Sequence, residues 1–351
     1  MTKVSDLAVA HCLKALSLAK GNPEAAIAYV EAQHWRDTAM VSSHLRSVVT
    51  AENTTLLDAT PLAVDFSSAV RPRTVLGRLP GVVRVPFLAR IVTGISGVTA
   101  GFVGRGKPIP VSAADLDGQT LGYKKVAGIV VIADELVQSS RPQSDVALNA
   151  DMVGATAQGI DMAFLNPANG GDDDTPAAVT AGVTALTSSG STVAQIDADL
   201  RLMVQQLIAV GSTLSNAAWI LRPATAVHLA GLRDSGGALA FPGVTAQGGT
   251  LLGLPVVTAG TLPDPGSPAS AQIVLLDGSQ VIVADEDQAL FDLSKHASLQ
   301  LLTNPTNSAA AGTATAMVSM YQTNSWAARA VRYINWTLRR PYVSVLTGVN
   351  Y

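Results

Sequence analysis

The stretch from Gln119 to Pro167 constrains the fold most, because it places a β-strand shortly before a long helix. Residues 124–133 are rich in Val and Ile, which favour a pleated, half-buried strand. Pro142 then ends the short stretch that follows the strand, since the residue before a proline is pushed away from helical geometry. Beyond it, apolar residues recur at helical spacing until Asn166-Pro167. The sequence therefore predicts a long helix at about residues 144–165.

A second region, further along the chain, alternates helices with short strands. Residues 192–210 show the i, i+4, i+7 apolar spacing of an amphipathic helix. A buried strand is predicted at 218–223 and a helix at 224–232. Two more strands flank Asp277-Gly278, a dipeptide typical of turns. We therefore expect a mixed α/β sub-domain from about residue 196 to 285.

The N-terminal region is predicted to contain helices followed by an extended arm. Helical patterns fill residues 1–45, with a break at Gly21 and a new start where Asn22 caps a helix that has Pro23 in its first turn. Residues 46–80 contain several prolines and few periodic elements. Residues 1–80 are therefore assigned to helices and an arm.

Residues 81–126 are interpreted as a long β-hairpin. One strand is predicted at 82–92, a glycine-rich stretch follows, and the return strand runs from about Gly118 to Ala133. A two-stranded hairpin is marginally stable on its own in water, so we expect a neighbouring subunit to cover its apolar side. The candidate interface residues are Val85, Phe87, Leu88, Ile91, Val92, Phe102 and Lys107.

The composition favours a protein whose surface is largely covered by other protein. Apolar residues make up 48% of the 351 residues and charged residues only 14%, whereas a soluble chain has about 25% charged residues. Extensive subunit contacts are the simplest explanation. We expect no membrane association, because no run of about 18 apolar residues is free of charge and proline. The net charge of −3 argues against bulk attraction to nucleic acid, although a local basic face stays open.

Residue types that carry catalysis or bind metals form no recognisable motif. The five histidines lack metal-ligand spacing, and the single cysteine, Cys12, lies in a predicted helix. The acidic runs 172–174 and 285–287 are predicted to be a solvated loop and a strand-end turn. The stretch 104–107 is not a phosphate loop, because Pro108 follows its lysine. We expect no enzymatic activity, no cofactor and no metal site.

The order of these elements resembles the HK97-type major capsid proteins of tailed phages. Residues carrying the resemblance are the strand and helix of 119–167, the loop Asn169 to Pro176, the stretch Leu251-Leu-Gly-Leu-Pro-Val256, and the Arg-Pro step within the apolar C-terminal stretch 327–348. The resemblance covers about residues 70–351. One departure is Arg105, which follows Phe102-Val103-Gly104 where relatives usually carry an acidic residue.

The resemblance implies an α+β, HK97-like capsid fold in several parts. Residues 1–80 would form N-terminal helices and an N-arm, and 81–126 the E-loop hairpin. A peripheral P-domain, with a long spine helix at about 144–165 and a β-sheet, would comprise 127–195 and 286–351. An axial A-domain would comprise 196–285. Relatives often carry a longer N-terminal scaffolding segment removed by a protease, and the N-terminal region here is expected to be too short for one.

The resemblance also implies a structural function. Copies would form hexamers and pentamers that close into an icosahedral shell around double-stranded DNA, since repeated heterologous contacts close as rings. The alternative is an encapsulin-like cellular shell that encloses protein cargo. Expected partners are other copies of the chain, a portal, scaffold or decoration proteins, and packaged DNA. The expected location is the virion capsid, assembled in the host cytoplasm. Candidate DNA-facing residues are Arg36, Arg46, Arg71 and Arg73.

Overall fold

The structure is a computed structural model, and it divides the chain into two compact units. It describes residues 8–19, 22–33, 35, 37–50, 68–94, 102, 116–134, 142–260, 262, 271–301 and 317–351. Unit 1 comprises residues 1–70, 126–157 and 287–332, and unit 2 comprises residues 71–125, 158–286 and 333–351. The four-part division drawn from the sequence remains a prediction.

Three short helices pack together in unit 1: α1 (Ala8–Leu18), α2 (Pro23–Gln33) and α3 (Thr38–Thr50). The predicted cap is confirmed, because the side-chain oxygen of Asn22 accepts hydrogen bonds from the backbone N–H groups of Glu24 (3.0 Å) and Ala25 (3.3 Å). His11 Nδ1 lies 2.8 Å from the buried carboxylate of Asp37 and joins α1 to the start of α3. The helices bury Cys12, Ala15, Ala26, Val30, Val41 and Leu45. Unit 1 also contains a small antiparallel pair, β12 (Ser298–Gln300) and β13 (Met317–Ser319).

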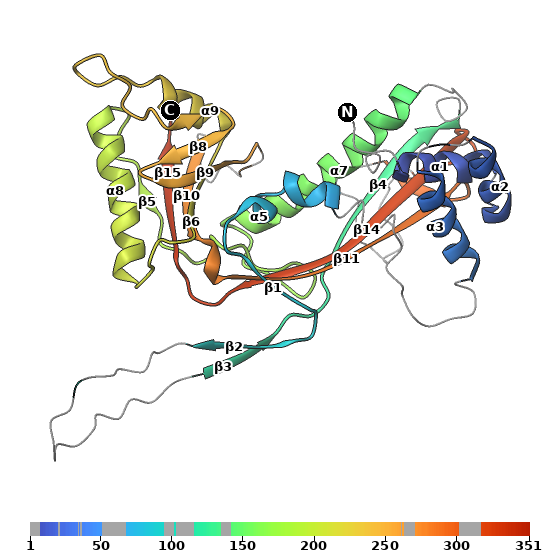
Figure 1. The fold of residues 1–351 in the computed structure, drawn as a ribbon, viewed down its shortest axis with the longest axis horizontal. Coiled ribbons are helices and arrows are strands. Elements are labelled where there is room, and N and C mark those ends of the chain that lie inside the picture. The colour runs from blue at the N-terminus through green and yellow to red at the C-terminus, as the bar shows by residue number, and fades with distance from the viewer. Residues whose placement is uncertain are drawn as a thin grey trace. The chain divides into compact units, whose positions relative to one another are not determined.

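The long helix is confirmed as α7 (Pro142–Leu165), two residues longer at its start than predicted (Figure 1). Met152 and Ile160 are buried along it, and the ring of Phe164 meets Trp336 edge-on at 5.5 Å. After the helix, the side-chain amide of Asn169 donates hydrogen bonds to the carbonyl oxygens of Ala163 (2.8 Å) and Pro176 (2.9 Å). These bonds fix the loop that follows the helix.

A four-stranded sheet has the order β1-β11-β14-β4. Its strands are β1 (Val83–Val85), β11 (Val281–Ser294), β14 (Ser325–Leu338) and β4 (Lys125–Ala133), and β11 and β14 are long strands that lie side by side (Figure 1). The prediction of a turn at 285–287 is wrong, because these residues continue β11. In β14 the consecutive residues Ile334, Asn335 and Trp336 are all buried, so burial does not alternate along this part of the strand.

A seven-stranded sheet in unit 2 has the order β5-β15-β10-β6-β9-β8-β7. Its central strands β10 (Ala271–Asp277) and β6 (Ala217–Leu221) were both expected from the sequence. The C-terminal strand of this sheet, β15 (Val343–Val349), pairs antiparallel with β10. Assignment of residues 286–351 to a peripheral domain remains a prediction. The remaining strands are β5 (Leu186–Thr187), β9 (Leu254–Thr258), β8 (Gly248–Leu251) and β7 (Val244–Thr245).

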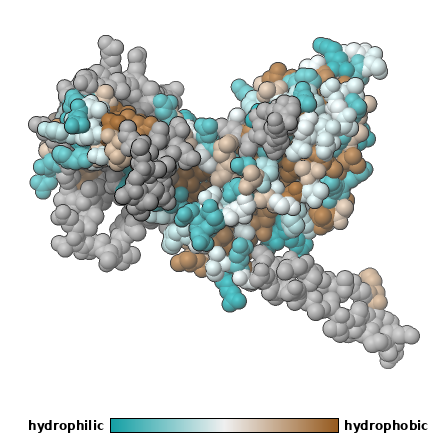
Figure 2. All heavy atoms as spheres, turned by 180° about the vertical axis from the view of Figure 1, so that it is seen from behind, coloured by the Kyte–Doolittle hydropathy of each residue, from teal (hydrophilic) through white to brown (hydrophobic). Residues whose placement is uncertain are grey.

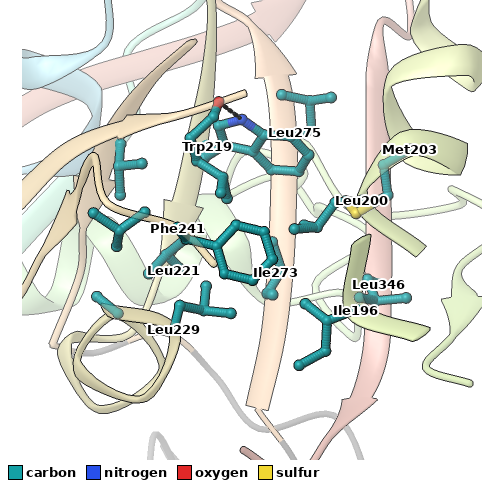
Figure 3. Packing of buried hydrophobic residues seen from close by; sticks show 14 of the residues in the cluster. Ile196, Leu200, Met203, Trp219, Leu221, Leu229, Phe241, Ile273, Leu275 and Leu346 are labelled. Atoms are coloured by element: carbon teal, nitrogen blue, oxygen red, sulfur yellow. Dashed lines mark hydrogen bonds between the residues drawn. The ribbon is translucent and has the colours of Figure 1, made fainter. Parts of the chain in front are cut away.

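The core of this sheet lies against α8 (Val193–Ala209) and α9 (Pro223–Gly231). Thr192 and Gln195 form a capping box that starts α8, which confirms the helix predicted at 192–210. The indole N–H of the fully buried Trp219 donates to the carbonyl of Leu251 (2.9 Å), so the polar atom of this large side chain is satisfied. Figure 3 shows Trp219 with other side chains of the same buried cluster: Ile196, Leu200, Met203, Leu221, Leu229, Phe241, Ile273, Leu275 and Leu346.

A short connection, η2 (Arg71–Arg73) followed by α5 (Val75–Arg78), leads towards the hairpin. A Cβ at Gly77 would lie 1.9 Å from the carbonyl oxygen of Arg71, so only glycine fits this position. Asp161 of α7 is buried and accepts a hydrogen bond from the backbone N–H of Val75 (2.8 Å). Burial raises the pKa of this carboxyl to about 7, while the Val75 N–H and the charge of Arg78 act in the opposite direction.

The raised pKa of Asp161 predicts that folding stability falls as the pH rises from about 4 to about 7. The stability gained from the protonated Asp161 carboxyl is fully present below the unfolded-state pKa of about 3.9. It is lost as the pH rises through the folded-state pKa, because the unfolded chain releases the proton first. Asp161→Asn keeps an oxygen acceptor for Val75 and cannot ionise, so it should flatten this part of the profile. Denaturant unfolding of both proteins at about pH 5 and about pH 8 measures the difference. An equal slope in the two proteins would contradict this role.

Candidate functional site: the root of the extended hairpin

The hairpin forms a two-stranded sheet of its own. β2 (Arg90–Gly94) and β3 (Leu116–Thr120) pair antiparallel, with Arg90 opposite Thr120 and Gly94 opposite Leu116. The single strand predicted at 82–92 is wrong, because β1 ends at Val85 and a turn at Phe87-Leu88 precedes β2. Pro86 stands at this break, and a proline inside a strand pattern signals such an interruption.

The root of the hairpin is packed against the chain's own core. Phe87, Ile91 and Leu121 are buried together with Ile282 and Ala284 of β11. The Phe87 ring stacks on Tyr123 at 4.5 Å, and Tyr123 meets Tyr333 edge-on at 5.9 Å. Val85 packs against the same cluster. We call this set the root cluster: Val85, Phe87, Ile91, Leu121, Tyr123, Ile282, Ala284 and Tyr333.

The root cluster corrects part of the predicted interface. Phe87 and Ile91 are each 7% exposed, and Val85 is half-buried, so their own chain and not a neighbour covers them. Leu88 is 63% exposed and Phe102 fully exposed, so these two remain candidates for contact with another subunit. The side chain of Val92, and Lys107 as a whole, lie outside the described residues.

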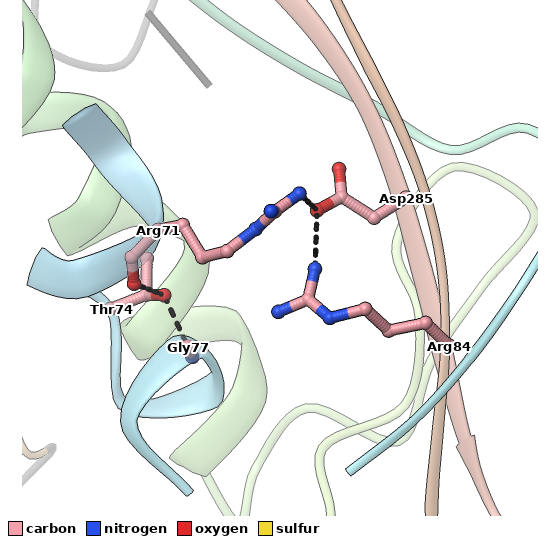
Figure 4. Close-up of polar contacts among 5 residues, drawn as sticks. All are labelled: Arg71, Thr74, Gly77, Arg84 and Asp285. Atoms are coloured by element: carbon pink, nitrogen blue, oxygen red, sulfur yellow. Dashed lines mark hydrogen bonds and ion pairs between the residues drawn. The ribbon is translucent and has the colours of Figure 1, made fainter. Parts of the chain in front are cut away.

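An ion cluster fixes the chain where it enters the hairpin (Figure 4). Arg71 of η2 and Arg84 of β1 approach the same oxygen of Asp285, at 3.4 and 3.5 Å. The Asp285 side chain is only 4% exposed, whereas those of Arg71 and Arg84 are 31% and 42% exposed. Thr74 holds the turn beside Arg71, because its hydroxyl donates to the Arg71 carbonyl (2.9 Å) and accepts from the Gly77 N–H (3.1 Å). Two cations around one nearly buried carboxylate thus join η2, β1 and β11.

Sequence reasoning missed Asp285 and Arg84 as members of this cluster. They lie 201 residues apart in the chain, so no local spacing connects them. Tyr123 was missed too, although an aromatic residue just before the predicted strand was a usable signal. The acidic run at 285–287 was a second signal, since a carboxylate inside a strand requires a partner when it is buried.

The four predicted DNA-facing arginines have different settings. Arg71 belongs to the ion cluster with Asp285. Arg46 forms an exposed ion pair with Glu31 at 2.7 Å, and Arg73 is exposed at the end of η2. Arg36 lies outside the described residues. Arg46 lies in unit 1 and Arg71 and Arg73 lie in unit 2, and their assignment to a DNA-facing surface remains a prediction.

Neither a metal cluster nor a candidate membrane helix is found in the part of the chain that the structure describes. No three His, Cys, Asp or Glu side chains within it converge as ligands. None of its helices has the length and apolar character needed to span a bilayer. Cys12 is buried, and burial raises the pKa of its thiol to about 12, so it is a poor nucleophile.

The comparisons with known proteins identify the family. The phage capsid family matches residues 80–329, and the chain belongs to that family. A curated relative, the capsid polyprotein of Pseudomonas phage PAJU2, is 34% identical over 301 residues. The match covers 84% of this chain and 44% of the relative, so the chain spans less than half the length of that polyprotein.

Solved phage capsid structures share the fold. The structure from Mycobacterium phage Bobi superposes with a TM-score of 0.56 at 14% identity, covering 86% of this chain and 97% of that one. The structure from Mycobacterium phage Adephagia superposes with a TM-score of 0.54 at 16% identity, covering 86% of this chain and 97% of that one. A capsid of a native gene transfer agent (GTA) particle, computed with C5 symmetry, superposes with a TM-score of 0.52 at 15% identity. The match covers 85% of this chain and 93% of that one. The fold is therefore HK97-like, as the sequence predicted.

The ion cluster generates a prediction about stability. Asp285→Ala leaves two cations facing each other without the carboxylate between them. It should therefore lower the free energy of unfolding by roughly 1–2 kcal/mol. This loss is smaller than that expected for a fully buried ion pair, because both arginines are partly exposed. Asp197→Ala is the matched control, since it removes an exposed pair with Arg201 on α8 (2.9 Å). It should cost about 0.5 kcal/mol or less. Denaturant unfolding of unassembled subunits measures both, and equal losses would argue against a structural role for the cluster.

Proposed function

We propose that this chain is the major shell subunit of a tailed-phage capsid, assembling as hexamers and pentamers into an icosahedral shell around double-stranded DNA. Membership of the phage capsid family over residues 80–329 carries the proposal. The HK97-like fold supports it, because solved phage capsid subunits have the same fold. The role is structural, and the expected location is the capsid of the virion. Assembly would take place in the host cytoplasm.

The surface composition supports extensive contacts between copies. Large apolar side chains are exposed on and next to α8, with Leu202 48%, Ile208 54% and Val210 51% exposed. Apolar residues are interspersed with polar ones on the face shown in Figure 2. A chain with only 14% charged residues is well suited to a shell in which each subunit is surrounded by neighbours.

The hairpin is proposed as the element that ties copies together. Its root is held by the subunit's own core, so the hairpin can project from a firm base. Leu88 and Phe102 keep apolar surface exposed on the subunit, and covering such surface contributes roughly 25 cal/mol per Å². A neighbouring copy in a closed shell is the natural source of that cover.

Replacing residues 94–112 by a short Gly-Ser linker should therefore leave a folded subunit that forms no closed shells. The replacement keeps Phe87, Ile91 and Leu121, so the root cluster survives. Circular dichroism reports folding, and sedimentation with negative-stain microscopy reports assembly. Particles like those of the unmodified protein would contradict the clamp role. An unfolded variant would show that the hairpin belongs to the core.

The contents of the particles distinguish a phage capsid from an encapsulin-like shell. Particles from infected or induced cells should hold nuclease-protected double-stranded DNA. Shells that hold protein cargo and no DNA would favour the encapsulin-like alternative, and a chain that forms no shells would overturn both. A portal and scaffold or decoration proteins are further partners that we infer from the function alone.

We infer that exposed arginines of the N-terminal region face the packaged DNA. Arg46 and Arg73 are exposed, and Arg36 is included from the sequence. Arg71 is left out, because its removal would disturb the cluster around Asp285. Changing Arg36, Arg46 and Arg73 to Gln should lower the retained DNA per particle and leave the yield of empty shells unchanged, since phosphate contacts carry the attraction. Equal loss of shells and DNA would argue against this assignment.

A further inference from the structure

A pocket of about 520 Å³ lies in unit 2, beside the root of the hairpin. Its walls come from the end of β3 and the residues after it, from the loop after α7, and from the last residues of β14. Its apolar part is formed by Leu121, Pro176, Ala177, Trp336 and Leu338. This volume lies within the range of about 300–1,000 Å³ that is usual for protein binding pockets. The pocket is therefore large enough for an aromatic side chain and its neighbouring backbone.

The walls of the pocket are held in place by hydrogen bonds. The Trp336 indole N–H donates to the Ala177 carbonyl (2.8 Å), which ties β14 to the loop after α7. The Asn335 amide donates to the Gly122 carbonyl (2.7 Å), and its oxygen accepts from the Trp336 backbone N–H (2.8 Å). Lys124 Nζ contacts the carbonyl oxygen of Asp172. A preformed pocket of this kind binds an occupant at low ordering cost.

One of the two acidic runs of the chain begins at the pocket. Asp172 lines the pocket, and Asp173 and Asp174 follow it, all exposed. The Asp172 carboxylate accepts hydrogen bonds from the backbone N–H groups of Thr175 (2.5 Å) and Asp174 (2.9 Å), which hold its pKa below the ordinary value. These bonds fix the loop and keep Asp172 ionised. The pocket thus combines apolar lining residues with the Asp172 carboxylate, and Lys124 lies beside that carboxylate.

The hairpin carries the complementary features. Phe102 is a fully exposed aromatic residue, and Arg105 and Lys107 follow it within five positions. A buried aromatic anchor flanked by charge pairs is a common arrangement at protein interfaces. Because Phe102 is fully exposed, it does not occupy the pocket of its own chain.

We propose that this pocket receives Phe102 from the hairpin of a neighbouring copy, with Arg105 and Lys107 of that copy placed against Asp172, Asp173 and Asp174. The proposal rests on the proposed function, since it requires many copies in one shell. It gives the hairpin a defined receptor site on the next subunit. It also explains why a basic residue, Arg105, follows Phe102-Val103-Gly104, because a carboxylate there would be repelled by the rim.

Intersubunit disulfide trapping tests the proposal on assembled shells. One chain carries Phe102→Cys and a second, differently tagged chain carries Ala177→Cys, and the two are assembled together. A dimer of the two tags on a non-reducing gel is expected from shells and absent from unassembled subunits. Cys12 is buried with a pKa of about 12, so it stays out of thiol exchange. Ala194→Cys, at an exposed position at the start of α8, is the matched control partner and should give no dimer.

The outcomes separate failure of this proposal from failure of the proposed function. Shells without a dimer between positions 102 and 177, or with equal dimer from position 194, would overturn the docking site and leave the capsid function standing. Absence of shells from the unmodified chain would remove the function itself. If Phe102→Cys alone prevents assembly, Val103→Cys replaces it and keeps the aromatic anchor, with the same two outcomes.

A charge exchange tests the rim independently. Arg105→Asp with Lys107→Asp, or Asp173→Lys with Asp174→Lys, should each lower shell yield by roughly threefold to tenfold, in line with the modest energy of exposed ion pairs. Combining the four changes should restore the yield. Full yield from both separate reversals, or no recovery in the combination, would overturn the charge pairing. A loss confined to DNA content would instead place the basic tip against nucleic acid and also overturn it.

Discussion

The packing of Phe87, Ile91 and Leu121 against Ile282 and Ala284 is the interaction on which the hairpin depends. A two-stranded ribbon cannot bury both of its faces and is marginal on its own in water. The subunit therefore stabilises the ribbon at one end, through aromatic contacts of Phe87 with Tyr123 and of Tyr123 with Tyr333. This packing gives the ribbon a fixed base within its own subunit.

The ion cluster complements this apolar packing at the entrance to the hairpin. Arg71, Arg84 and Asp285 come from three elements that are separate in the sequence. Their contacts fix the relative orientation of these elements, because a carboxylate oxygen and a guanidinium bind within a narrow range of distance and angle. Apolar packing supplies most of the stabilisation, since it removes surface from water. The cluster contributes mainly by setting where η2 and β1 lie with respect to β11.

Elements with a strong local pattern could be predicted from the sequence, and long-range pairings could not. The capping box at Thr192 and the apolar period of α8 are encoded within 20 residues, so the helix was predicted within one residue at each end. The pairing of β15 with β10 depends on two segments about 70 residues apart, and an apolar run does not state its partner. The interruption at Pro86 was visible in the sequence, yet the surrounding valines favoured one continuous strand.

In the candidate site, too, local features could be predicted from the sequence and long-range contacts could not. The sequence named Phe102 as a candidate contact and the structure exposes it, because residue type and position between two strands are local properties. Burial of Phe87 and Ile91 depends on β11, which is almost 200 residues further along the chain, so no local pattern separates root from tip. The consequence for assembly is physical. Two adjacent apolar residues differ in burial. Phe87 is buried within its own subunit, whereas Leu88 is exposed and has a φ of 60°. A left-handed conformation at an exposed leucine costs about 1 kcal/mol, and the adjacent burial of Phe87 is what offsets it.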